Sequence, residues 1–526
     1  MKSNKSIILK PVFYLAFAAT IWSCTDDFTK INTNEKQITT DAIAKDVLLQ
    51  GQVFAQAQYA SMYSDPYYFQ YAQNWSADLY VQYFALTTPD AEADRYDFTD
   101  SWSGETWLSF YSDCAPHIKA IEDITAENHN EVGNAMAKIL KVLAYSRITD
   151  HYGPIMYSQF GNGELVVPFD TQESIYADFF VQLDEAVSIL KANPGAEMFS
   201  SDDRMFGGSA DRWLQFANSL RLRMAIHIRY ADATKARMEA EKAIIDGVIT
   251  DGSEDAFVAV DNIIRSPYAT ITAWGEFRMS AAMESVLKGY NDPRIPTYFA
   301  EAVVGDSDGD GLAYEGLLNG QSQSALTSPP NDDYSNMSLP YLPIEEGGTN
   351  GNYEIMTAAE VYFLRAEGAL QGWSMDGTAK EMYERGIRAS LTAKSDASEA
   401  FITSYINSSD TPVPYEEGAP ALTNIPIAFS ANPETQFEQI MTQKWLAIYP
   451  NGWEAWVDLR RTGYPKMYER LFSDNPDVGP SEIMRRIKYP DLEADTNPVG
   501  LEEALQFPEM QGGNKNSTKV WWDKKN

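Results

Sequence analysis

The segments TAAEVYFLRAEGALQGW, residues 357–373, and GTAKEMYERGIRASL, residues 377–391, have the pattern of two helices that pack on each other. Both segments repeat apolar residues at intervals of three or four, which places them on one face of an α-helix. Small side chains in one helix would let large ones pack across a helical hairpin. The facing residues are Ala359, Phe363, Ala366 and Ala369 in the first helix and Ala379, Tyr383 and Ile387 in the second. The pattern predicts a tetratricopeptide-like helix pair, with a helical hairpin outside any repeat as the alternative.

The same helical period dominates the rest of the chain. It predicts helices within residues 41–61, 131–154 and 170–195, and further helix pairs within 211–249 and 434–465. The alternation that is typical of strands is scarce. The sequence therefore predicts a mainly α-helical protein, in which stacked helices are connected by long irregular segments.

The N-terminus has the charge pattern of an export signal. Lysines precede an apolar run at 11–22, which is about half of the roughly 20 residues that a membrane-spanning helix needs. Cys24 follows in a stretch that resembles a bacterial lipobox, and two aspartates come soon after it. We expect a lipoprotein signal peptide at 1–23, an acylated Cys24, a flexible tether at 24–40 and one domain at 41–526. The alternative is an ordinary cleaved signal that ends in a chance cysteine.

The charge of the chain excludes one class of partner. Asp and Glu number 75 against 41 Lys and Arg, and the net charge is −34 at pH 7. Such a surface repels phosphate backbones, whose binding depends on cationic side chains. Nucleic acid is therefore excluded, whereas the acidity either favours a neutral or basic ligand or serves solubility. Cys114 has no disulfide partner once Cys24 is acylated, so we expect a buried thiol.

Aromatic residues gather between residues 63 and 113, outside the expected helix stripes. Sugar rings can stack on aromatic side chains, while planar polar groups bind the hydroxyls. Trp102 stands in DSWSGE, a loop-like context, and Trp274 stands in the similar context TAWGEFR. The predicted ligand-binding residues are Trp75, Tyr80, Tyr83, Trp102, Trp107 and Trp274. For each ring, packing in the core is the alternative.

An acidic loop resembles the opening of a calcium site. GDSDGDG, residues 305–311, places Asp306, Asp308 and Asp310 at alternate positions before a glycine, so that their carboxylates can converge on a cation. The twelfth position of a calcium loop, where a glutamate is expected, is Leu317. A structural calcium ion is one interpretation, and a solvated acidic turn is the other.

The common enzyme signatures are missing from the sequence. It contains no His-Glu-x-x-His zinc motif, no phosphate-binding loop that ends in Gly-Lys-Ser/Thr and no Gly-x-Ser-x-Gly elbow. A pair of carboxylates could hydrolyse a glycosidic bond, but 75 acidic residues identify no particular pair. We therefore expect a protein that is not an enzyme and that requires no cofactor, with a surface-tethered glycan hydrolase as the alternative.

The order of several blocks carries a family resemblance. The blocks are AKILKVLAYSRITDHYGPI, WLQFANSLRLRMAIHI, AAEVYFLRAEGAL, YERGIRASL, QKWLAIYPNGWEAWVDLRRTGYP, RRIKYPDLEADTN and KVWWDKKN. In this order they resemble the SusD/RagB-like nutrient-binding outer-membrane lipoproteins, and the SusD-like subgroup in particular. The resemblance covers nearly the whole chain after Cys24.

The resemblance implies a SusD-like α-helical fold with tetratricopeptide-like units. It also implies a lipid-anchored protein of the outer membrane, facing the cell exterior, that captures a nutrient oligomer and delivers it to a SusC-like TonB-dependent barrel transporter. Whether the ligand is an oligosaccharide or an oligopeptide stays open. A helical scaffold without a small ligand is a further alternative.

Overall fold

The computed structural model describes residues 47–63, 65–260, 265–349, 351–416 and 418–525. The expected signal peptide, Cys24 and the tether lie outside these residues. Within the described ranges, no helix is long and apolar enough to cross a membrane.

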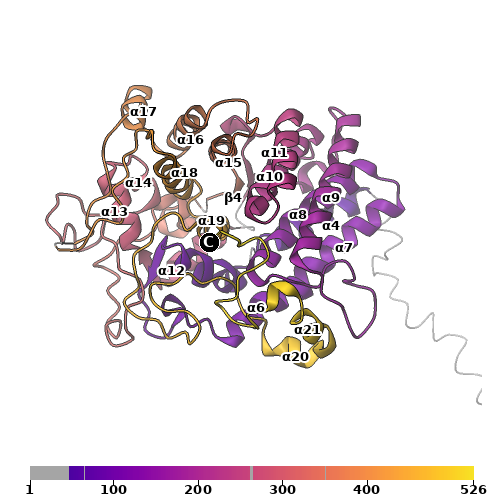
Figure 1. Ribbon diagram of the computed structural model, residues 1–526, viewed down its shortest axis with the longest axis horizontal. Helices are drawn as coiled ribbons and strands as arrows, with labels where there is room; N and C mark the ends of the chain where they lie inside the picture. Colours follow the sequence, from indigo (N-terminus) through magenta and orange to yellow (C-terminus); the bar gives the residue numbers. More distant parts are fainter. Residues whose placement is uncertain (1–46, 64, 261–264, 350, 417, 526) are drawn as a thin grey trace, which may run out of the picture.

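Long helices stack side by side through most of the molecule (Figure 1). They are α4 (Val47–Ala60), α7 (Ala115–Glu127), α8 (Glu131–Tyr152), α9 (Gln172–Ala192), α10 (Ala210–His227), α11 (Ala233–Asp246), α15 (Ala358–Leu370), α16 (Ala379–Lys394) and α18 (Pro433–Ala447). Each contacts the next one along the stack, and α10 joins the earlier group to α15. The predicted mainly helical fold is confirmed.

The helix pair expected at 357–391 is present as α15 and α16, which contact each other closely. Helix α16 begins with a capping box, in which Thr378 and Glu381 each accept a hydrogen bond from the other's backbone N–H. A Cβ on Gly386 would lie only 2.8 Å from the ring of Phe363. A glycine at this position therefore lets the large side chain of α15 pack directly on the backbone of α16.

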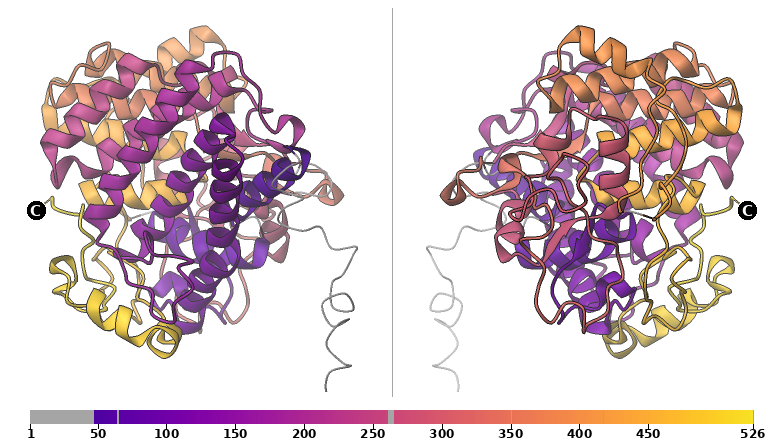
Figure 2. Two further views of the ribbon diagram at one scale, coloured as in Figure 1. Left: turned by 90° about the vertical axis from the view of Figure 1, so that its right-hand side faces the viewer. Right: turned by 90° about the vertical axis from the view of Figure 1, so that its left-hand side faces the viewer.

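Shorter helices and irregular segments complete the fold, some of them inside it and some at its surface. The short helices are α5 (Pro66–Phe69), α6 (Asp100–Ser109), α12 (Pro267–Trp274), α13 (Ala281–Gly289), α14 (Ile295–Tyr298), α17 (Glu399–Ile406), α19 (Gly452–Thr462), α20 (Asp491–Thr496) and α21 (Pro498–Ala504). Two π-helices, η1 (Gln70–Asp78) and η3 (Phe110–Cys114), interrupt the N-terminal third. The last helices, α20 and α21, lie at the end of the molecule opposite α16 and α17 (Figure 2).

The strands of the described residues form two small antiparallel sheets. Strand β1 (Phe84–Leu86) pairs with β3 (Phe277–Met279), and β2 (Ala256–Val258) pairs with β4 (Tyr353–Met356). Each sheet joins segments that are far apart in the sequence. The sheets therefore tie the irregular connections to the helical stack.

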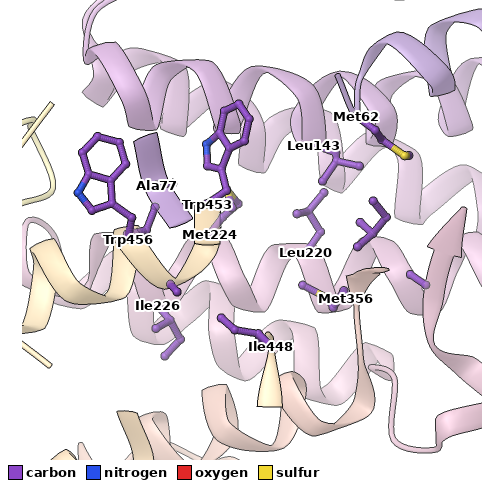
Figure 3. Close-up of a cluster of buried hydrophobic side chains, with 14 of the residues drawn as sticks. Met62, Ala77, Leu143, Leu220, Met224, Ile226, Met356, Ile448, Trp453 and Trp456 are labelled. Atoms are coloured by element: carbon purple, nitrogen blue, oxygen red, sulfur yellow. The ribbon is translucent and has the colours of Figure 1, made fainter. Parts of the chain in front are cut away.

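Helix α19 lies in the centre of the core. Trp453 and Trp456 on α19 pack in one cluster with Leu143 of α8, Leu220 of α10 and Ala77 of η1 (Figure 3). The sequence predicts that this helix pairs with α18, but its largest contact is with η1. The reason is that both indole rings face the interior between η1 and α8, so the helix is held from several sides.

Buried ion pairs connect the helices around α19. Arg223 on α10 binds Glu360 on α15 through two hydrogen bonds of 2.7 Å. Arg461 on α19 binds Glu367 on α15 and is also paired with Asp458, 2.6 Å away on its own helix. Because both partners of each pair are buried, removing one partner would leave an uncompensated charge in the core.

Candidate ligand-binding site

Aromatic side chains from α5, η1 and α6 pack together in a cluster that we call the aromatic platform: the exposed or partly exposed Tyr67, Tyr68, Tyr71 and Trp102, with the buried Trp75 beneath them. Tyr67 packs edge-on against Tyr71 with a centroid distance of 5.0 Å, and Tyr71 stacks on Trp102 at 6.1 Å with an interplanar angle of 19°. Trp75 meets Trp102 edge-on at 5.0 Å. Tyr67 is 47% exposed, whereas Trp75 lies beneath the others at 8%.

The π-helix η1 positions Tyr71 and Trp75. Its inner face carries Asp78, whose carboxylate accepts hydrogen bonds from the hydroxyl of Tyr268 at 2.9 Å and from the backbone N–H of Gly452 at 3.1 Å. A Cβ on Gly452 would lie 2.7 Å from the backbone of Asp78, so only glycine permits this approach. The contact between Gly452 at the start of α19 and Asp78 thus holds η1 in place from the side of the core. A π-helix of this kind is frequent at functional sites.

Helix α6 positions Trp102. The side chain of Thr99 caps the helix, and the hydroxyl of Ser103 donates to the carbonyl of Lys488 at 2.6 Å. The prediction that Trp102 lies in a loop is wrong, because the cap at Thr99 starts a helix there. Its ring is nevertheless only partly buried, although Tyr71, Trp75 and Phe98 pack against it.

Polar groups surround the platform. Burial, followed by the charges of Glu105 and Asp65, raises the pKa of the Tyr68 hydroxyl. Burial and a hydrogen bond with Tyr67 raise the pKa of the Tyr71 hydroxyl, and the negative charge of Glu105 raises it further. At neutral pH both tyrosines therefore carry a proton that they can donate. Carboxylates and phenols beside exposed rings can bind the hydroxyl groups of a ligand whose apolar face lies on the rings.

Trp274 lies near the same region. It is the last residue of α12, is 44% exposed and precedes Gly275, which ends the helix in the left-handed conformation. Helix α12 packs against α5, and the side chain of Gln70 donates to Glu276. Among the described residues no ring contact joins Trp274 to the platform, so its role in ligand binding stays a prediction.

Besides Trp75, which is buried beneath the platform, three predicted ligand-binding residues are core residues instead. Tyr83 stacks on Trp445 at 5.5 Å and donates its hydroxyl to the carbonyl of that residue at 2.6 Å. Tyr80 packs against Trp456, and Trp107 is surrounded by aromatic rings and donates to Glu493 at 2.8 Å. None of the three presents a face to solvent, so the prediction of ligand contact is corrected for Tyr80, Tyr83 and Trp107.

The platform lies in the aromatic stretch that the sequence indicates, but the exposed Tyr67 and the half-buried Tyr68 and Tyr71 were not among the predicted residues. The available signal was Asp65-Pro66, a cap followed by proline at the first helical position. This signal fixes the direction in which the following side chains point. The interruption of helix α5 by η1, which brings Tyr71 against Trp102, has no sequence signature that we recognise.

The acidic loop at 305–311 is a separate feature. The carboxylate oxygens of Asp306, Asp308 and Asp310 lie within 4.8 Å of one another. Most of their contacts are local, since Asp306 accepts from the backbone N–H groups of Gly309 and Gly311. The ammonium group of Lys288 on α13 lies 3.2 Å from Asp308 and 3.0 Å from Asp310. The ammonium group of Lys288 therefore balances part of the negative charge of this loop.

A groove of about 570 Å³ lies next to the loop. Glu284, Glu315 and Asp308 line it, and Lys288 pairs with the buried Glu284 at 2.8 Å. Burial raises the pKa of Glu284 to about 8, although Lys288 acts in the opposite direction. The ammonium group of Lys288 therefore already compensates part of the charge of the carboxylates that could hold a metal ion, and protonation neutralises Glu284 at neutral pH.

Comparison with known families identifies the class of protein. The model of the SusD-like family, described as Susd and RagB outer membrane lipoprotein, matches residues 30–523. The chain belongs to the SusD-like family of outer membrane lipoproteins, which confirms the resemblance seen in the sequence.

Solved structures agree with this assignment. A chitin-binding SusD homologue from Flavobacterium johnsoniae is 32% identical with a TM-score of 0.81, over 90% of this chain and 98% of that one. SusD homologues from Bacteroides thetaiotaomicron and Bacteroides vulgatus are each 30% identical with TM-scores of 0.80. The matches cover 91% and 90% of this chain and 99% and 97% of the homologues, respectively. No curated protein matches the chain.

Proposed function

We propose that the protein captures a nutrient oligomer on the aromatic platform and delivers it to a SusC-like TonB-dependent transporter, without chemical change to the ligand. The observation that carries the proposal is the stacked pair of Tyr71 and Trp102, which leaves Tyr67 exposed beside it. Soluble proteins seldom leave such a group of rings uncovered unless a ligand or partner uses it.

We further propose that the ligand is a glycan. Rings in a row suit the repeated apolar faces of an oligosaccharide, and carboxylates and phenols at their edges suit its hydroxyls. One similar structure is that of a chitin-binding homologue. Chitin oligosaccharides are therefore the first ligands to test, and oligopeptides form the comparison set.

The test is calorimetric titration of the purified protein with panels of oligosaccharides and oligopeptides, followed by product analysis of each mixture. We expect saturable binding of one glycan class in the micromolar to millimolar range, with the ligand recovered intact. Saturable binding of peptides alone would contradict the glycan assignment. Cleaved products whose amount depends on the amount of protein would contradict capture without chemical change and would favour a hydrolase.

The location and the partner belong to the same proposal. The family is one of outer membrane lipoproteins, and we propose that Cys24 carries the lipid anchor and that the domain faces the cell exterior. Replacement of Cys24 by alanine should release the protein from the membrane fraction. Affinity purification of the intact lipoprotein from its own membranes should recover a TonB-dependent barrel. If no barrel is recovered, the proposal of delivery to a transporter is contradicted, while that of ligand binding is not.

A further inference from the structure

A pocket of about 400 Å³ beside the C-terminus carries the opposite charge to the rest of the molecule. Its lining includes Arg460, Lys466, Arg485 and Lys525, against a single carboxylate, Glu434. The whole chain has a net charge of −34. Four cationic side chains around one pocket are therefore a local reversal of charge.

Arg460 supplies a buried donor at this pocket. It is 1% exposed, and its guanidinium lies between the rings of Trp456 at 3.6 Å and Trp522 at 4.8 Å. Nε donates to the carbonyl of Trp456 at 3.2 Å, and Nη1 donates to the carbonyl of Arg485 at 3.1 Å. Nη2 has no hydrogen-bond partner among the described residues. A buried donor without a partner is costly, and a ligand can remove that cost.

The neighbouring Arg461 is also buried, but its charge is balanced by carboxylates. Arg461 is paired with both Glu367 and Asp458, and although burial opposes its charge these two carboxylates raise its pKa. For Arg460, burial outweighs the carboxylates of Asp150 and Asp523 and lowers the pKa to about 9. The charge of Arg460 is therefore only partly balanced by the protein itself.

Two lysines offer further donors at the same pocket. The ammonium group of Lys466 lies over the ring of Tyr464 at 4.4 Å, and within the described residues it makes no ion pair or hydrogen bond. Lys525 donates to the carbonyl of Thr462 at 2.8 Å and has two further protons to donate. Arg485 is occupied by Asp523 at 2.9 Å, so it contributes mainly charge.

We propose that this pocket binds a tetrahedral oxyanion, a phosphate or sulfate group, through Arg460, Lys466 and Lys525. A planar carboxylate is best held by two parallel bonds from one guanidinium, and Arg460 has no such pair of free donors. Single donors from three side chains suit the separate oxygens of a tetrahedral group instead. The site shares no residue with the aromatic platform, so it does not depend on the function proposed above.

The negative charge of Glu434 should repel an oxyanion in this pocket. Removing that charge should therefore strengthen binding, which tests the proposal in the opposite direction to the loss of a lysine. Glu434 lies in the first turn of α18, is exposed, and accepts a hydrogen bond from the hydroxyl of Tyr464 at 2.8 Å. Glu434→Gln keeps an oxygen acceptor for Tyr464 and removes the negative charge. The pocket of this variant should therefore bind an oxyanion more tightly.

The experiment is calorimetric titration of the purified protein with sodium phosphate, sodium sulfate and, as the planar comparison, sodium acetate, all at the same ionic strength. We expect saturable binding of phosphate or sulfate. Lys466→Gln should weaken this binding about tenfold, the value of one charge-assisted hydrogen bond, and Glu434→Gln should strengthen it several-fold. Both side chains are exposed, so neither variant should change the unfolding temperature.

Lys515→Gln is the matched control, because Lys515 is exposed and does not line the pocket. It removes the same charge and should leave the affinity unchanged. Equal weakening by Lys515→Gln and Lys466→Gln would reduce the effect to general electrostatics and overturn the site. No saturable heat with phosphate or sulfate, or equally tight binding of acetate, would overturn the proposal as well.

Discussion

The ring of Tyr71 lies nearly parallel to the indole of Trp102, with centroids 6.1 Å apart and planes inclined by 19°. The two residues come from η1 and α6, and neither ring stands alone: Tyr67 packs on one side and Trp75 on the other. A ligand that stacks on one ring therefore meets a surface that is already ordered. Preorganised rings cost little entropy when a ligand binds.

Trp102→Ala should weaken binding of the glycan at least tenfold, because it removes the centre of the platform and the support of Tyr71. Calorimetric titration with the ligand found in the panel measures the change. Phe401→Ala is the control, since Phe401 is 43% exposed and belongs to α17, which lies on the opposite side of the molecule from α6 (Figure 1). An unchanged affinity for Trp102→Ala would remove the platform from the proposed function.

Trp107→Ala should lower the free energy of unfolding by about 3–5 kcal/mol, the usual cost of removing a buried tryptophan. Trp107 packs against Tyr152, Phe169 and Tyr489, so its removal opens a cavity. Urea denaturation of the variant measures the loss. A loss below about 1 kcal/mol would mean that Trp107 is not the core residue described above.

Glu367→Gln should destabilise the protein by about 3–5 kcal/mol at pH 7, because it leaves Arg461 and Arg229 in the core without their carboxylate. Burial opposes ionisation of Glu367, but these two arginines lower its pKa to about 2. Since the pKa is lower in the folded state, the stabilisation is complete above about pH 4.5 and is lost as the pH falls toward 2. The difference between wild type and variant in urea denaturation should therefore shrink over this range; a constant difference would contradict the ion pair.

Asp78→Asn should show the opposite pH dependence. Burial raises the pKa of Asp78 to about 8, although hydrogen bonds from Tyr268 and Gly452 act against the shift. A carboxyl whose pKa is raised on folding stabilises below its unfolded pKa near 4 and loses this contribution as the pH rises to 8. The variant should gain stability relative to wild type by a few kcal/mol between pH 4 and 8. Thermal unfolding across this range measures the gain, and parallel curves would contradict the raised pKa.

For the acidic loop, we propose that Asp306, Asp308 and Asp310 bind calcium only weakly, because Lys288 competes for the same oxygens. Millimolar calcium should raise the unfolding temperature of the wild type by less than about 2 °C, in line with a weak site. Lys288→Met should be less stable in EDTA and should recover more than the wild type when calcium is added. A large effect of calcium on the wild type would show that the ion displaces the lysine.

The helical class, the family and the helix pairs within 211–249 and 357–391 could be predicted from the sequence. The pair expected within 434–465 could not, because the largest contact of α19 is with η1 and not with α18. Helical periodicity survives in every context because it reflects the burial of one face of each helix, and the ordered blocks after Cys24 are specific as a set. The sequence also identified the aromatic stretch from which the platform is built. These features depend on local sequence patterns or on the order of the sequence blocks along the chain.

Which aromatic rings are exposed depends on the tertiary packing and not on the local sequence. Tyr83 and Trp107 lie inside because Trp445 and Tyr489, more than 300 residues away, cover them, whereas the rings of Tyr67 and Tyr71 have no such cover. The basic pocket at Arg460 likewise depends on the packing of Trp522 and Lys525 against α19. Exposure and charge compensation are set by partners that are distant in the sequence, and no local pattern encodes them.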